Sequence, residues 1–156
     1  MTTVATPKIA VIGAGNMGAN HARVVAASAR AVLDLVIDTD TDRATAIASQ
    51  LGTRASTEAR SAFDCDAVIV AGPTEAHLEI ALPLLEAGIP CLVEKPLADD
   101  LAAVRALVDA SAKAGVALMC GFVERFNPAV QATHDLMDGP PLHLLAVRHS
   151  PHNPRT

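Results

Sequence analysis

The feature that most constrains this chain is a glycine-rich turn directly after a short apolar run. The run is Lys8-Ile-Ala-Val-Ile12, and the turn is Gly13-Ala-Gly15-Asn-Met-Gly18, with the spacing G-x-G-x-x-G. A continuous apolar run of this length predicts a strand covered on both faces. Helical periodicity follows, from residue 16 to about residue 29. A strand, this turn and a helix in succession predict the first unit of a dinucleotide-binding fold.

Each glycine of the turn has a separate role in such a fold. Gly13 permits the tight turn, and Gly15 lets the backbone approach a pyrophosphate without a Cβ in the way. Gly18 lies on the helix face that packs against the sheet, where a side chain would hold the helix away. The free N–H groups around Asn16 and Met17 then point at the phosphates.

An acidic residue completes the fingerprint. Asp38 ends the second predicted strand, 20 residues after Gly18 (38 − 18 = 20). A carboxylate there can accept the ribose hydroxyls of adenosine and would repel a 2′-phosphate, which favours NAD over NADP. No arginine lies immediately beside Asp38, and Arg43 is five residues further on. The alternatives are that Asp38 only caps the next helix, or that the loop binds S-adenosylmethionine, which leaves the later motifs unexplained.

Strands and helices alternate along the first 124 residues. We predict six strands in all. Five of them are placed, at 8–12, 33–37, 67–71, 90–93 and 116–120, and the third in chain order has no assigned range. A helix with apolar residues from 44 to 51 ends at Gly52, another begins at Thr74 as N-cap and ends at Gly88, and a third begins at residue 99 or 100 and ends at Gly115. This α/β alternation predicts a doubly wound parallel sheet, a Rossmann fold, over residues 1–124.

Composition excludes several other classes. The 156 residues carry a net charge of −5 with 12 Lys and Arg that do not cluster, so we expect no nucleic-acid partner. No apolar run reaches the roughly 18 residues of a membrane span, and we expect no signal peptide before the first strand. The three cysteines, at positions 65, 91 and 120, lack zinc-ligand spacing, so we expect buried thiols, no metal and a cytoplasmic setting.

Two further segments follow the fourth and fifth strands, at the sheet edge where ligands bind. They are Gly72-Pro73-Thr74-Glu-Ala-His77 and Glu94-Lys95-Pro96. The Lys95 ammonium would project towards the cofactor cleft, where it can stabilise a developing alkoxide or carry a proton. The tripeptide alone is equally compatible with a surface lysine. His77 alone is more typical of the first turn of a helix than of a ligand.

Together these motifs resemble the glucose–fructose oxidoreductase, inositol dehydrogenase and rhizopine catabolism (Gfo/Idh/MocA) family. The glycine loop with Met17 and His21, the two segments above and the segment from Gly121 to Pro128 carry the resemblance, which covers residues 8 to 156. It implies NAD(P)-dependent hydride transfer at a hydroxyl carbon of a sugar, an inositol or a sugar nucleotide. The closing segments look most like UDP-N-acetylglucosamine 3-dehydrogenase relatives.

The resemblance also implies roles for individual residues. Lys95 would be catalytic, orienting the substrate hydroxyl and the nicotinamide, and the Lys95–Pro96 peptide would be cis. The implied cofactor contacts, besides the glycine loop and Asp38, are Gly72, Pro73, Thr74, His77, Glu94, Lys95 and Arg125. Members of the family continue into a β-sheet domain that supplies a catalytic Asp/His pair, most of the substrate pocket and the homo-oligomer interface.

The tail, residues 125–156, reads as the start of that second α+β domain. Asn127 and Pro128 predict an N-cap and first residue of a helix to about residue 137, followed by a strand at 142–149. Phe122 and Phe126 are expected to pack in the core. As given, the chain is expected to bind cofactor and to lack the catalytic Asp/His half. The alternative function is a non-catalytic NAD(H)-binding regulatory module.

Overall fold

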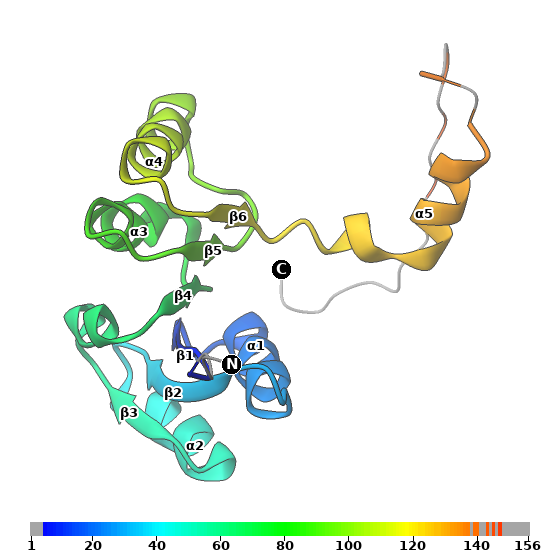
Figure 1. Cartoon of the computed structure of the whole chain (residues 1–156). Helices are drawn as coiled ribbons and strands as arrows, with labels where there is room; N and C mark the ends of the chain where they lie inside the picture. Colours follow the sequence, from blue (N-terminus) through cyan, green and yellow to red (C-terminus); the bar gives the residue numbers. More distant parts are fainter. Residues whose placement is uncertain (1–4, 138, 141–142, 144, 146, 148–156) are drawn as a thin grey trace. The chain divides into compact units, whose positions relative to one another are not determined.

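The fold is a parallel sheet with helices on both faces (Figure 1). The structure is a computed structural model that describes residues 5–137, 139, 140, 143, 145 and 147. Within these residues the sheet has the strand order β3-β2-β1-β4-β5-β6, the order of doubly wound dinucleotide-binding folds. Its strands are β1 (Lys8–Ile12), β2 (Val32–Ile37), β3 (Arg54–Ser56), β4 (Ala67–Val70), β5 (Cys91–Val93) and β6 (Leu118–Cys120).

Helices connect the strands, and glycine or aspartate residues fix several of their ends. The α-helices are α1 (Asn16–Ala26), α2 (Thr41–Leu51), α3 (His77–Glu86), α4 (Leu101–Ala114) and α5 (Pro128–Asp135), with short 3₁₀ turns η1 (Ala59–Asp64), η2 (Thr74–Ala76) and η3 (Val123–Phe126). Asp100 caps α4, because its carboxylate accepts the N–H of Ala103 at 2.7 Å. Gly52 and Gly115 end α2 and α4 in the left-handed conformation, as predicted.

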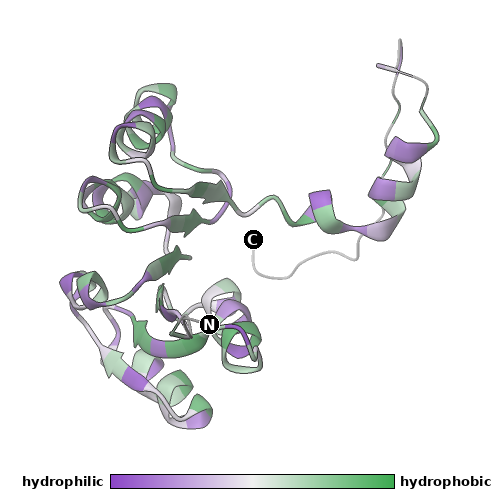
Figure 2. Ribbon diagram, viewed as in Figure 1, coloured by the Kyte–Doolittle hydropathy of each residue, from purple (hydrophilic) through white to green (hydrophobic). Residues whose placement is uncertain are grey.

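Alternating side chains of the strands point into two separate hydrophobic cores. Ala10 and Ile12 of β1 face the core made with α3 and α4, whereas Val11 faces the core made with α1 and α2. This is why strands β4 and β5 are apolar along their whole length, as their green colour in Figure 2 shows. The continuous apolar runs of the sequence therefore predicted the fold class correctly.

Several element boundaries differ from the predictions. Helix α1 stops at Ala26 rather than near residue 29, because Ser28 forms a turn in which its hydroxyl accepts the N–H of Arg30 at 3.1 Å. Strand β6 starts two residues late, because the N–H of Val116 still bonds Ser111 at the end of α4. Thr74 was wrong as an N-cap: it lies in η2, and α3 begins at His77 without a side-chain cap.

The chain divides into two compact units, Met1–Phe122 and Val123–Thr156. In the second unit, Asn127 caps α5 as predicted by accepting the N–H of Ala129 at 3.0 Å, and the helix ends two residues before the predicted limit. The predicted strand at 142–149 falls mostly outside the described residues. The expectation that Phe122 and Phe126 pack in the core was wrong, since they are 53% and 70% exposed.

Candidate functional site

The glycine turn joins β1 to α1 at the carboxyl edge of the sheet. Gly13 has a φ of +95°, and a Cβ there would lie 2.6 Å from the backbone of Ala71 and Gly72. A Cβ on Gly18 would lie 1.6 Å from the carbonyl oxygen of Gly13. Both positions therefore require glycine because backbone meets backbone there, and not because of any ligand.

Gly15 is different, because none of the residues that the structure describes occupies the space in front of it. A Cβ at this position would have no neighbour within 4 Å. Gly15 is the N-cap of α1, and no side chain caps the first N–H groups of that helix. A bare helix N-terminus with open space before it fits a phosphate group, which accepts those N–H groups. The loop thus fits the pyrophosphate of a dinucleotide.

Asp38 lies just beyond β2 and is tied to the glycine turn. One carboxylate oxygen accepts the N–H of Ala14 at 2.7 Å and the other accepts the N–H of Asp40 at 2.9 Å. The alternative that Asp38 caps α2 is wrong, because that cap is Asp40, which accepts the N–H of Arg43 at 3.1 Å. A carboxylate held by two backbone donors is fixed in place, and each oxygen keeps a lone pair for a further donor.

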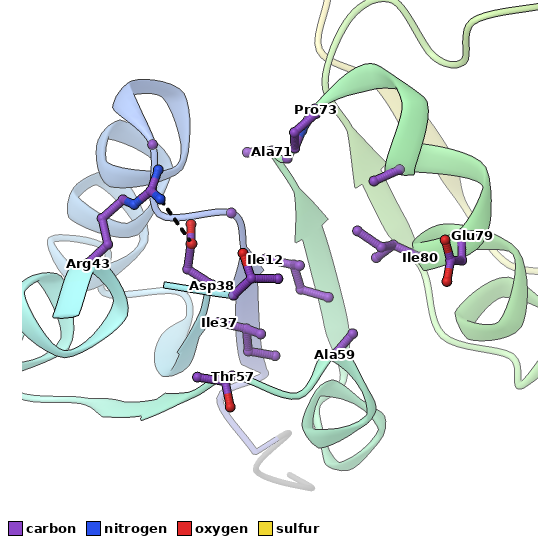
Figure 3. A pocket seen from close by; sticks show the side chains of 15 residues that line it. Ile12, Ile37, Asp38, Arg43, Thr57, Ala59, Ala71, Pro73, Glu79 and Ile80 are labelled. Atoms are coloured by element: carbon purple, nitrogen blue, oxygen red, sulfur yellow. Dashed lines mark ion pairs between the residues drawn. The ribbon is translucent and has the colours of Figure 1, made fainter. Parts of the chain in front are cut away.

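Arg43 lies beside Asp38 in space although not in sequence. Its guanidinium Nη2 is 3.7 Å from Asp38 and 3.1 Å from Asp40 (Figure 3). Sequence reasoning dismissed Arg43 because of the five-residue spacing. The capped first turn of α2 brings the side chain back to the end of β2, which the position of Asp40 as a capping residue could have indicated.

A cleft of about 660 Å³ lies between the glycine turn, Asp38 and Arg43 on one side and η2 and α3 on the other. Figure 3 shows Arg43 at one side, Ile80 at the other, and Ile12 and Ile37 between them. Of the predicted site residues, those that line the cleft are Gly13, Gly15, Asp38, Gly72 and Pro73. Those outside its lining are Asn16, Met17, Gly18, Thr74, His77, Glu94, Lys95 and Arg125. The cofactor contacts of both sets stay predictions.

His77 is enclosed in the protein, with a residue exposure of 1%. Its Nδ1 lies 3.0 Å from the carbonyl oxygen of Pro96, and its Nε2 lies 3.1 Å from that of Gly72. The ring therefore joins the loop after β4 to the loop after β5. This geometry favours a supporting role for His77 over direct contact with a ligand.

Glu94 is also buried, at 6% exposure, and its carboxylate is used within the protein. His21 of α1 places Nε2 2.8 Å from one oxygen, and the N–H of Lys95 donates to the other at 3.1 Å. A Cβ on Gly121 would come within 2.8 Å of this carboxylate, so a larger residue there would displace the Glu94 carboxylate from its present position. No local sequence pattern indicated this role for Gly121.

Lys95 lies in the loop that buried Glu94 and His77 hold, and Lys95 itself is exposed. The Lys95–Pro96 peptide is cis, as the resemblance implied. Among the described residues no acidic side chain forms an ion pair with the Lys95 ammonium. Arg125 belongs to the second unit, where its carbonyl accepts the side-chain N–H of Gln131 at 3.1 Å.

Other chemistries find little support in the part of the chain that the structure describes. Burial raises the pKa of the Cys91 thiol to about 12, and burial together with the Asp34 carboxylate raises that of Cys65 to about 11, so both are poor nucleophiles. No group of three or more metal-ligating side chains comes together in the described residues. None of the helices described there is both long and apolar enough to span a membrane.

Known proteins of similar sequence are dehydrogenases. The chain is 35% identical over 148 residues to a UDP-N-acetylglucosamine 3-dehydrogenase of Acidithiobacillus ferrooxidans, covering 94% of this chain and 46% of that protein. It is 34% identical over 160 residues to an inositol 2-dehydrogenase of Leifsonia xyli, covering 99% and 47%. The chain therefore spans about half the length of these curated relatives.

Solved structures give the same result. GenD2 from gentamicin A biosynthesis, solved in complex with NAD, superposes with a TM-score of 0.80 and 35% identity over 87% of this chain and 40% of that one. Residues 7–122 match the oxidoreductase family with the NAD-binding Rossmann fold. Together with the loop, acid and cleft described above, this match shows that the chain belongs to the glucose–fructose oxidoreductase, inositol dehydrogenase and rhizopine catabolism family.

Proposed function

We propose that this chain is the cofactor-binding part of an NAD-dependent dehydrogenase that acts on a hydroxyl carbon of a sugar, an inositol or a sugar nucleotide. The observation that carries the proposal is the carboxylate of Asp38, held by the N–H of Ala14 at 2.7 Å and lining the same cleft as Gly15. The carboxylate that would accept the ribose hydroxyls and the helix end that would bind the phosphates then share one rigid connection, which supports the proposal.

Different residues of the cleft would contact different parts of the cofactor. The open N-terminus of α1 would bind the pyrophosphate, and Asp38 would accept hydrogen bonds from the adenosine ribose. The apolar side chains of Ile37 and Ile80 line the same cleft and suit an adenine ring. When bound, the nicotinamide supplies the hydride acceptor or donor.

Lys95 is the residue that we assign to the reaction itself. Its backbone is fixed through Glu94 on one side and Pro96 on the other, while its ammonium is exposed. There the ammonium would donate a hydrogen bond to the substrate hydroxyl oxygen and stabilise negative charge as the proton leaves. Glu94 and His77 would act through Lys95 by holding this loop.

The wider proposal concerns the whole protein. Relatives named for inositol and UDP-N-acetylglucosamine support a sugar-type substrate. The free thiols of Cys65, Cys91 and Cys120 fit a reducing compartment such as the cytoplasm. Exposed hydrophobic side chains in the second unit, Phe126 and Leu136 among them, offer apolar surface for a homo-oligomer.

Titration calorimetry with NADH tests the cofactor site. We expect the chain to bind NADH, and Asp38→Ala to weaken binding by at least ~10-fold, the scale of losing a hydrogen bond to a charged group. Asp109→Ala, which removes an exposed carboxylate on α4, is the matched control and should bind as the unmodified chain does. Circular dichroism would show that each variant is folded. Unchanged NADH affinity in folded Asp38→Ala would remove this residue from the site.

Amine acylation tests the position of Lys95. The chain has three lysines, so Lys8 and Lys113 are internal references in the same sample. We expect saturating NADH to slow acylation of Lys95 several-fold, read by peptide mass spectrometry, because the nicotinamide end covers its ammonium. The rates at Lys8 and Lys113 should not change. Equal rates at Lys95 with and without bound NADH would show that it lies away from the cofactor.

A further inference from the structure

Glu79 of α3 brings a carboxylate to the cleft wall that the proposed NAD site does not use. It lines the cleft beside Ile80, across from Arg43 (Figure 3). The residue is exposed, and its carboxylate forms no ion pair or hydrogen bond with any other residue that the structure describes. A carboxylate without a protein partner keeps its acceptor capacity for a ligand.

The rest of the cleft wall offers few groups that can read a base. Most of its residues are apolar, and the polar ones besides Glu79 are Asp38, Thr39, Arg43 and Thr57. Asp38 and Arg43 approach each other at 3.7 Å at the proposed ribose end. A threonine hydroxyl can donate or accept, so it suits every base edge, whereas a carboxylate only accepts. Beyond the ribose end, Glu79 is thus the lining side chain that can discriminate between bases.

The helical position of Glu79 suits the edge of a base rather than its face. The proposed adenine position lies against Ile80, and Glu79 is the preceding residue of the same helix. Consecutive residues of a helix point about 100° apart. With Ile80 against the flat face of the ring, Glu79 therefore approaches the rim, where the donors and acceptors of the base lie.

Purine bases differ at the 6-position in the group that they offer to such a carboxylate. Adenine carries an amino group there, which donates, whereas guanine and hypoxanthine carry a carbonyl oxygen, which accepts. The Glu79 carboxylate can accept from the amino group, but it would meet the carbonyl oxygen with no proton between them. The carboxylate therefore complements adenine and opposes a 6-oxopurine.

We propose that Glu79 accepts a hydrogen bond from the 6-amino group of adenine, so that the cleft selects an adenine dinucleotide over a 6-oxopurine dinucleotide. The inference rests on the proposed function, because it takes the base to lie between Ile37 and Ile80. It adds a cause of base selection, since apolar contact alone cannot strongly reject a ring of the same shape.

Calorimetry with two dinucleotides tests the inference on the full chain. NADH is compared with deamino-NADH, in which hypoxanthine replaces adenine and the rest of the molecule is unchanged. We expect the unmodified chain to bind NADH at least ~5-fold more tightly, a modest ratio because water reaches the exposed Glu79. In Glu79→Gln the ratio should fall to about 1, because an amide can accept from the amino group or donate to the carbonyl oxygen.

Two further variants separate the contact from the charge. Glu86, the last residue of α3, is exposed and lies outside the cleft lining, so Glu86→Gln removes the same charge from the same helix and should keep the ratio of the unmodified chain. Glu79→Ala should lose the preference as well, by weakening the binding of NADH. Circular dichroism would show that each variant is folded.

Three outcomes would overturn the inference. The unmodified chain could bind both dinucleotides equally. Glu79→Gln could keep the preference for NADH. Glu79→Gln and Glu86→Gln could strengthen both dinucleotides alike, which would mean that only the overall negative charge matters. In each case NADH binding that depends on Asp38 would leave the proposed function standing, whereas no NADH binding to the unmodified chain would reject both.

Discussion

The two halves of the candidate site use their polar residues in opposite ways. On the aspartate side, defined by Asp38, Asp40 and Arg43, the side chains of Asp38 and Arg43 line the cleft and retain capacity for a ligand. On the lysine side, defined by His77, Glu94 and Lys95 with their partner His21, two of the motif residues are buried and bonded to the protein itself. Only Lys95 among those motif residues is exposed.

This difference teaches that residues of a binding motif need not touch the ligand. Glu94 and His77 are as much part of the family resemblance as Lys95, yet their polar atoms contact protein groups at 2.8 to 3.1 Å. Because buried polar groups must be bonded, a loop held this way has few alternative conformations. The lysine side is therefore expected to respond to mutation through stability, and the aspartate side through ligand selection.

The largest expected effect is that of His77→Leu. The substitution removes the ring N–H that bonds one of two carbonyl oxygens, that of Gly72 or that of Pro96, and puts an apolar side chain beside it, so we expect a loss of about 2 to 4 kcal/mol in the free energy of unfolding. Urea unfolding followed by circular dichroism measures it.

His134→Leu, an exposed position on α5, is the control and should change the free energy of unfolding by less than about 0.5 kcal/mol. His77→Gln should recover part of the loss, since its amide can donate to one carbonyl. If His77→Leu were as stable as the control, the two sides of the site would not differ as described.

A smaller loss is expected for His21→Leu. This change removes one partner of the Glu94 carboxylate, which among the described residues then keeps the N–H of Lys95 alone, so we expect a loss of about 1 to 2 kcal/mol in the free energy of unfolding by urea. The loss is smaller than at His77 because the His21 side chain is 20% exposed and water can reach the vacated position.

The double variant His21→Leu/Glu94→Leu sharpens the comparison. If the cost comes from an unpartnered buried carboxylate, removing that carboxylate as well should restore part of the stability lost in His21→Leu. Losses that simply add would mean that the two residues act independently, and that the lysine side is not held by their contact.

The sequence by itself determined the elements whose signals are local. The apolar run of β1, the glycines of the turn, and Gly52 and Gly115 at helix ends all follow from periodicity and backbone freedom within a few residues. The position of Asp38 after β2 was likewise readable from its spacing to Gly18. These predictions needed no knowledge of what lies across the sheet.

Only the tertiary structure decided the contacts between residues far apart in the chain. Strand β3 has three residues and no apolar run, so its pairing with β2 defines it. The place of Arg43 beside Asp38, the two carbonyls at His77 and the approach of Gly121 to Glu94 also depend on how separate segments meet. Residue types and spacings specify local conformation, whereas partners across the fold are selected by packing, which no short stretch of sequence contains.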